Sequence, residues 1–241
     1  MFVTTFSKRS LGIRLYHSIY HVNPAIVDLS KPENLLLEKA YTQYVPKHGF
    51  SNKSIELASS DMGLNSNTPN ALFNFTTDSR NINMELILFH LKKSRQELQH
   101  VSLEGSEFDK LRILLHKRLQ LNTPIARHLP AMLGTMILPS NVLQSLKELH
   151  NLSDDISYYA GDRSIDFAWY SKRMSISQLF VLSELFMVND TSAGYQDTYK
   201  FVDNKLKEIL TAGYIYNSVE EWTFFNAVSL VNIIKSQLAR G

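Results

Sequence analysis

The chain has 241 residues, of which 44% are hydrophobic and 20% are charged, so it can build a large core and is not a disordered chain. It contains no cysteine, which excludes disulfides and thiolate zinc sites. The net charge is +2, and removal of residues 1–16 leaves 22 basic against 23 acidic side chains, which argues against general affinity for nucleic acid.

The N-terminal segment is basic and acid-poor. Residues 1–27 contain Lys8, Arg9 and Arg14, several serines and threonines, and no acidic side chain. This composition is typical of a mitochondrial transit peptide, with a disordered basic tail as the alternative. Because Arg14-Leu15-Tyr16 suits a processing site after Tyr16, we expect residues 1–16 to be removed and the mature chain to be flexible as far as Ser30.

Hydrophobic residues recur at helical spacing along almost the whole chain, and no alternating pattern bounded by hairpin turns predicts a strand. The predicted fold class is therefore all-α. Glycines and a serine cap set the boundaries in the N-terminal part. The expected segments are a helix over 33–48 ending at Gly49, a short helix from Ser51 to Gly63, a polar loop or degraded helix over 64–80, and a long helix over 83–100.

The C-terminal part is richer in apolar residues and follows a linker at 101–107. Its helices are expected over 108–121, from Thr123 to just before Pro139, from a Ser140 cap to Ala160, from Ser164 through Phe186, over 194–213 and over 218–240. This layout divides the chain into a helix-turn-helix-like unit at 31–100 and a larger helical bundle at 106–241.

The N-terminal unit has the helix order of a helix-turn-helix DNA reader. A recognition helix needs Arg and Lys to reach phosphates and base edges, whereas residues 51–80 hold only Lys53 and Arg80 against three acidic side chains. Pro69 would also interrupt a helix there. We therefore expect a vestigial unit that keeps the shape of a regulator, and no nucleic-acid partner.

The sequence lacks the motifs of common catalytic sites. It contains no nucleophile elbow, phosphate-binding glycine loop or His-Glu-x-x-His. A single Glu-x-x-His, Glu97 and His100, lacks the second copy that a di-iron bundle needs. Asp154 and Asp155 fail as an Asp-Asp-x-x-Asp magnesium motif, since Tyr158 stands where the third acid is required. These aspartates are expected to cap, pair or dock, and we predict no catalytic residue, metal or cofactor.

Soft and broad apolar side chains gather in residues 129–187. Methionine repacks easily and therefore suits an adaptable lipid pocket, while ordinary core packing is the alternative. The candidate lipid-binding residues are Met132, Met136, Met174, Phe180 and Phe186.

The last expected helix has one broad apolar face. Such a helix completes a bundle, forms a dimer seam or lies on a membrane. Its few basic residues predict modest attraction to anionic lipids. The candidate membrane-facing residues are Trp222, Phe224, Leu230, Val231, Ile234 and Leu238.

One stretch of sequence resembles a known family. Residues 152–187, which include Ser-Asp-Asp-Ile-Ser-Tyr-Tyr-Ala-Gly-Asp and Asp-Phe-Ala-Trp-Tyr-Ser-Lys-Arg, closely resemble the mitochondrial accessory lipid-binding proteins of ubiquinone (coenzyme Q) biosynthesis. Residues 44–50 match that family's first helix and turn, and residues 231–241 look like its fungal members. The resemblance runs from Asn34 to the end of the chain.

The resemblance implies a TetR-regulator-like fold, assembled as a homodimer, with an isoprenoid quinone or phospholipid in an apolar cavity of the bundle. It also implies a peripheral position on the matrix side of the mitochondrial inner membrane, and docking of demethoxyubiquinone hydroxylase and other ubiquinone-biosynthesis proteins. An exposed Trp169 is expected to anchor the hydroxylase, with a buried core tryptophan as the alternative. The docking residues that the resemblance carries over are Asp154, Asp155, Asp166, Phe167, Trp169 and Tyr170.

These observations together predict a non-enzymatic, lipid-binding protein that presents a quinone intermediate to the hydroxylase. Three alternatives stay open. They are a TetR-type DNA-binding regulator with a small-molecule pocket, an enzyme of quinone modification, and a purely structural scaffold of the biosynthetic complex.

Overall fold

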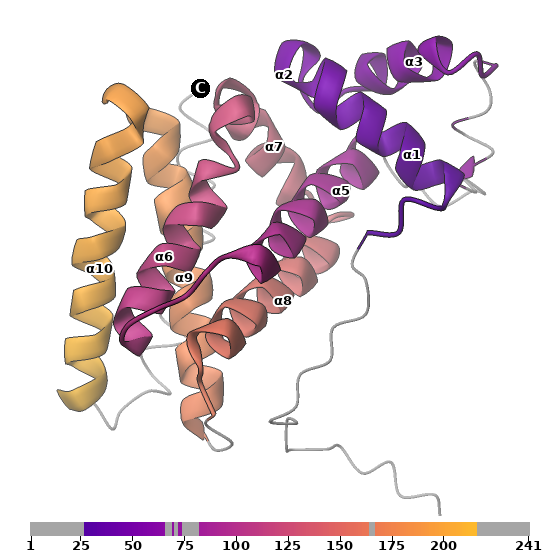
Figure 1. The fold of residues 1–241 in the computed structure, drawn as a ribbon. Helices are drawn as coiled ribbons and strands as arrows, with labels where there is room; N and C mark the ends of the chain where they lie inside the picture. Colours follow the sequence, from indigo (N-terminus) through magenta and orange to yellow (C-terminus); the bar gives the residue numbers. More distant parts are fainter. Residues whose placement is uncertain (1–26, 66–68, 70–71, 74–81, 164–166, 216–241) are drawn as a thin grey trace, which may run out of the picture.

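The computed structural model describes residues 27–65, 69, 72–73, 82–163 and 167–215, and every secondary-structure element in these ranges is helical (Figure 1). The predicted all-α class is therefore confirmed. The expected transit peptide, Asp166, and the last helix with its candidate membrane-facing residues from Trp222 to Leu238 lie outside the described residues.

The first helix runs without a break from Pro32 to His48 but changes its winding on the way. Helix α1 (Pro32–Lys39) passes into a π-helical turn (Ala40–Tyr44) and then into α2 (Val45–His48). Pro46 explains the widened turn, because its ring has no N–H and would clash with the carbonyl group one turn earlier. The helix boundary predicted at Gly49 is confirmed, since Gly49 ends α2 with a φ of 72°.

Gly49 also joins the first helix to the rest of the bundle. A Cβ atom at this position would lie 2.9 Å from Nδ1 of His128, so only glycine allows the close approach. The neighbouring Arg127 donates to the carbonyl oxygens of Pro46 and Lys47 at the same helix end. Helix α3 (Asn52–Asp61) follows Ser51, whose hydroxyl donates to the His48 carbonyl and does not cap the helix.

Three helices follow in the middle of the chain. Helix α5 (Ile82–Gln96) ends in a 3₁₀ turn (Glu97–His100), and α6 (Glu107–Gln120) begins with a complete capping box between Ser106 and Asp109. The helix expected from Thr123 is confirmed as one helical run, but residues 123–128 wind as a 3₁₀ helix and α7 covers only Leu129–Met136. Pro130 lacks the N–H needed to continue an α-helix through this point.

The last described helices are the longest. Helix α8 (Val142–Ala160) starts after Asn141, so the expected Ser140 cap is wrong by one position, and the predicted stop at Gly161 is confirmed by its φ of 94°. Helix α9 (Phe167–Asn189) and helix α10 (Gln196–Ile215) follow. A short 3₁₀ turn (Ala193–Tyr195) precedes α10.

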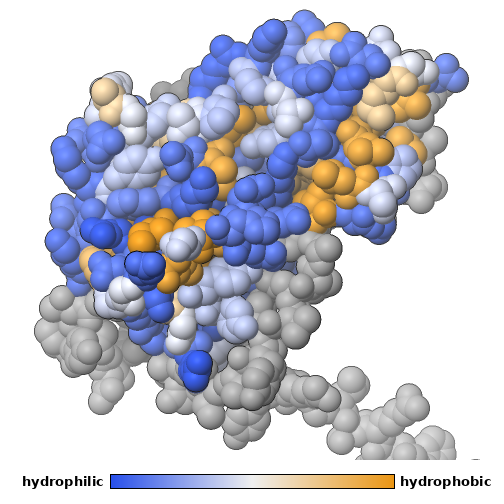
Figure 2. All heavy atoms as spheres, in the orientation of Figure 1, coloured by the Kyte–Doolittle hydropathy of each residue, from blue (hydrophilic) through white to orange (hydrophobic). Residues whose placement is uncertain are grey.

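Helices α6, α8, α9 and α10 lie side by side as a bundle, with the N-terminal helices at one end (Figure 1). Helix α5 joins the two parts, because it packs against α1 on one side and against α7 and α8 on the other. Residues of both parts share one hydrophobic core. Hydrophilic residues cover most of the face seen in Figure 2, and hydrophobic residues gather over the N-terminal helices and, on the left of the view, over the bundle.

Candidate docking site and buried polar clusters

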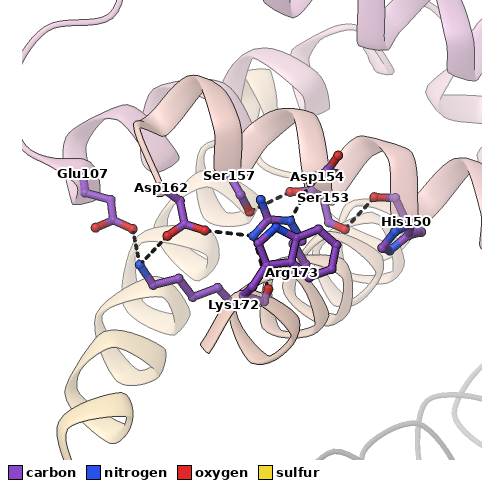
Figure 3. A network of polar contacts seen from close by, with 9 residues as sticks. Glu107, His150, Ser153, Asp154, Ser157, Asp162, Lys172 and Arg173 are labelled. Atoms are coloured by element: carbon purple, nitrogen blue, oxygen red, sulfur yellow. Dashed lines mark hydrogen bonds and ion pairs between the residues drawn. The ribbon is translucent and has the colours of Figure 1, made fainter. Parts of the chain in front are cut away.

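The candidate docking motif lies where α8 ends and α9 begins, and ion pairs fix this junction (Figure 3). Arg173 of α9 donates from Nε to Asp154 Oδ1 at 2.6 Å and from Nη1 to Asp162 Oδ2 at 2.8 Å. Its Nη1 also donates to the Trp169 carbonyl one turn earlier. A single guanidinium group therefore ties the last turns of α8 and the following loop to the first turns of α9.

Lys172 extends this network to a third helix. Its Nζ lies 2.9 Å from Asp162 Oδ1 and 3.0 Å from Glu107 Oε1 of α6. The Asp162 side chain is 2% exposed and accepts hydrogen bonds from both Lys172 and Arg173. Because buried carboxylates require compensating donors, Asp162 fixes the relative positions of the loop and the two basic residues.

Trp169 lies inside this junction and is only 5% exposed. The Arg173 guanidinium stacks over its ring at 3.9 Å, and the His150 ring lies 6.0 Å away in an edge-on arrangement. The expectation of an exposed Trp169 anchor is therefore wrong, and the alternative, a buried core tryptophan, is confirmed. Of the three roles expected for Asp154, the structure shows pairing.

Two side chains of α9, Tyr170 and Met174, are exposed at the junction. Each is 45% exposed, and they stand four residues apart on α9, so they share one face of the helix. The Tyr170 ring meets the Trp169 ring edge-on, with centroids 4.8 Å apart. Sequence reasoning placed Met174 in a lipid pocket, whereas the structure places it on the surface beside the docking motif.

Asp155 points into the protein and not toward a partner. Its side chain is 1% exposed and accepts from Arg95 Nη1 at 2.6 Å, while Arg95 Nε donates to Glu148 Oε1 at 2.7 Å. These bonds join α5 to α8. Asp155 is therefore a pairing residue inside the protein, and the expectation that it docks a partner is wrong for this chain because its carboxylate is buried.

The remaining docking and lipid candidates do not share one surface. Phe167 begins α9, and its side chain is not among the described ones. Met132 and Phe180 are core residues, and Met136 is partly buried. Phe186 is 39% exposed and stacks on Phe201 of α10. The five lipid candidates therefore do not line a common internal surface.

A second buried polar cluster lies between α5, α6 and α9, and sequence reasoning missed it. Its members are Tyr41, His90, Ser94, Arg118, Asn122 and Glu184. The sequence did indicate a buried polar group here. Arg118 stands four residues after Leu114 on the apolar face of its helix, where a hydrophobic side chain is the normal choice.

Burial shifts the pKa values in this cluster. It lowers the pKa of His90 to about 3, with the positive charge of Arg118 as the second cause. Burial also raises the pKa of Glu184 and lowers that of Arg118. His90 is therefore neutral at physiological pH.

Glu97 and His100 are both exposed on a 3₁₀ turn. Among the described residues, no group of three or more His, Asp or Glu side chains is placed to hold a metal ion. None of the described helices is long and apolar enough to cross a bilayer.

The fold and the site define an all-helical protein whose bundle is cross-linked by buried ion pairs. Residues 142–213, which contain the α8–α9 junction, match the family profile COQ9. The chain is 35% identical to the mitochondrial ubiquinone biosynthesis protein COQ9 of Saccharomyces cerevisiae, over 95% of each chain. It is 35% identical to the Schizosaccharomyces pombe protein of the same name, over 95% of this chain and 88% of the relative. The human relative is 29% identical over 75% of this chain.

The chain therefore belongs to the COQ9 family of ubiquinone biosynthesis proteins. The resemblance inferred from residues 152–187 is confirmed, and so is its fungal character. The relatives are named mitochondrial, in agreement with the basic, acid-poor N-terminal segment.

Proposed function

We propose that this protein is a non-catalytic accessory protein, which binds an isoprenoid quinone intermediate in the mitochondrion and presents it to demethoxyubiquinone hydroxylase. Its membership of the COQ9 family supports a role in ubiquinone biosynthesis. The sequence also lacks the motifs of a hydrolase, a phosphate-binding enzyme or a metalloprotease.

The physical need for such a protein follows from the substrate. Burying each CH₂ group of a lipid tail is worth about 0.8 kcal/mol, so a long isoprenoid chain does not cross water unaided. A helical bundle can shield the tail, while a docked enzyme receives the ring. Organic extraction of the purified protein, followed by mass spectrometry, should yield a stoichiometric isoprenoid quinone. A clean extract from a folded protein would reject the lipid function and leave a scaffold.

The single observation that carries the docking assignment is the exposed pair Tyr170 and Met174 on a junction fixed by buried ion pairs. Aromatic residues and methionine are enriched at protein interfaces. A rigid support lowers the entropy lost when a partner binds. Tyr170 therefore replaces Trp169 as the proposed anchor for the hydroxylase, because Trp169 is buried.

Tyr170→Ala should weaken binding of the hydroxylase by about tenfold or more, as truncation of an interface aromatic anchor does, while the melting temperature stays within a few degrees of wild type. Phe186→Ala is the matched control, because Phe186 is also a half-exposed aromatic of α9 and lies about 24 Å along the helix from Tyr170. Surface plasmon resonance with the immobilised hydroxylase measures both. Equal affinities of the two variants and wild type would reject the docking surface.

The proposal includes a homodimer that lies on the inner membrane. Sedimentation equilibrium tests the first property, and flotation with vesicles of inner-membrane composition tests the second. Removal of residues 218–240 should abolish flotation, because the expected amphipathic helix there is the proposed membrane contact. A truncated protein that floats like wild type would reject that role.

A further inference from the structure

Arg118 of α6 is a charged side chain at the centre of the protein, with 1% of its surface exposed. Its Nη1 donates to Asn122 Oδ1 at 2.8 Å, and its Cζ lies 4.9 Å from the centre of the Phe180 ring. The guanidinium therefore borders an apolar side chain of the core.

The other edge of the guanidinium has no acceptor. Nε and Nη2 are both buried and make no hydrogen bond, and among the described contacts no ion pair joins Arg118 to a carboxylate. Nε and Nη2 lie on the same edge of the guanidinium group, and their N–H bonds point in parallel. We call this pair of donors the fork, because it can bind two neighbouring oxygen atoms at once. Buried donors without partners are costly, so an unfilled fork indicates a missing acceptor.

The neighbouring polar side chains hydrogen-bond to one another and do not fill the fork of Arg118. Asn122 Oδ1 accepts from Arg118 and lies 3.1 Å from His90 Nε2, while Asn122 Nδ2 donates to Glu184 Oε1. These bonds require the proton of the neutral imidazole to be on Nε2. His90 Nδ1 then accepts from the Tyr41 hydroxyl at 3.0 Å. The polar cluster thus holds Arg118 by one nitrogen and leaves the fork open.

Arg95 shows that the fold can satisfy a buried arginine. Its Nε and Nη1 each meet a buried carboxylate, at 2.7 Å and 2.6 Å. Near Arg118, the carboxylate of Glu184 accepts a hydrogen bond from Asn122 and not from the guanidinium group. Glu184 therefore offsets the positive charge of Arg118 without occupying its fork.

We propose that Nε and Nη2 of Arg118 bind two neighbouring oxygen atoms at the polar end of a lipid ligand. This inference rests on the proposed lipid binding and deepens it, because it assigns the residue that recognises the head of the ligand. Two sources share this chemistry: the adjacent ring oxygens of a quinone and the phosphate of a phospholipid.

Calorimetric titration of the delipidated full chain tests the inference with two probes, a short-tail ubiquinone and a short-chain phosphatidylcholine below its micelle concentration. Arg118→Lys keeps the charge and the stem but loses the fork. It should bind the preferred probe about tenfold more weakly or worse, the loss expected for one or two hydrogen bonds to a charged group. The matched control is Arg95→Lys, which should bind within about twofold of wild type because both carboxylate partners of Arg95 belong to the protein.

The outcomes separate the two proposals. If Arg118→Lys loses affinity only for the ubiquinone, the ligand of Arg118 is a quinone head group. If it loses affinity only for the phospholipid, the ligand is a phosphate. Wild-type affinity for both probes in Arg118→Lys overturns the Arg118 site alone. A wild-type protein that binds neither probe overturns the lipid function with it. If Arg118→Lys does not fold, a structure of the wild-type protein loaded with the ubiquinone decides, since ring oxygens away from Nε and Nη2 refute the site.

Discussion

The ion-pair network of the α8–α9 junction gives a stability prediction that can be worked out from its contacts. Arg173→Met keeps most of the side-chain volume but removes the bonds to Asp154, Asp162 and the Trp169 carbonyl. Breaking a buried pair from one side costs about 3–5 kcal/mol. Asp162 retains Lys172 at 2.9 Å, so the lower end, about 3 kcal/mol, is expected.

Urea unfolding followed by circular dichroism measures this loss, which corresponds to a melting temperature lower by about 6–12 °C for a chain of this size. Lys172→Met is the matched control, because it removes the other partner of the same carboxylate. Lys172 is 40% exposed, so its loss should cost less than about 1 kcal/mol. Similar free energies of unfolding for the two variants would refute the argument that Arg173 is the principal link between α8 and α9.

Two further predictions concern buried rings. Trp169→Ala should lower the free energy of unfolding by about 3–5 kcal/mol, measured by urea titration, since it empties a packed site; a loss below about 1 kcal/mol would contradict its burial. His90 stays neutral when folded because burial lowers its pKa to about 3, whereas the unfolded chain takes up the proton near pH 6.5. The contribution of His90 to the free energy of unfolding is therefore fully present above pH 6.5. It is lost as the pH falls from 6.5 toward 3, at about 1.4 kcal/mol per pH unit. His90→Gln should flatten the pH dependence of stability over this range, and an unchanged slope would show that His90 is not its source.

The order of the helices was predictable because it depends on local chemistry. Apolar residues at helical spacing, and glycines able to adopt a positive φ, placed the helix ends at Gly49 and Gly161 correctly. Pairing was one of three roles expected for Asp154 and Asp155, and both form ion pairs, since partly or fully buried carboxylates need compensation. The 3₁₀ winding of residues 123–128 was not predicted, because Pro130 was not weighed against the apolar spacing around it.

What the sequence determined by itself was the helical class, the family and the segment that carries the α8–α9 junction. Only the tertiary structure decided which member of the adjacent pair Trp169 and Tyr170 faces solvent, because neighbouring residues on a helix point in different directions and the packing of α8 against α9 selects one to bury. It alone also decided that Nε and Nη2 of Arg118 have no acceptor while Arg95 pairs with two carboxylates. The two carboxylates that pair with Arg95 come from α8, which is distant in sequence, and a charge on an apolar helix face does not reveal whether a carboxylate will reach it.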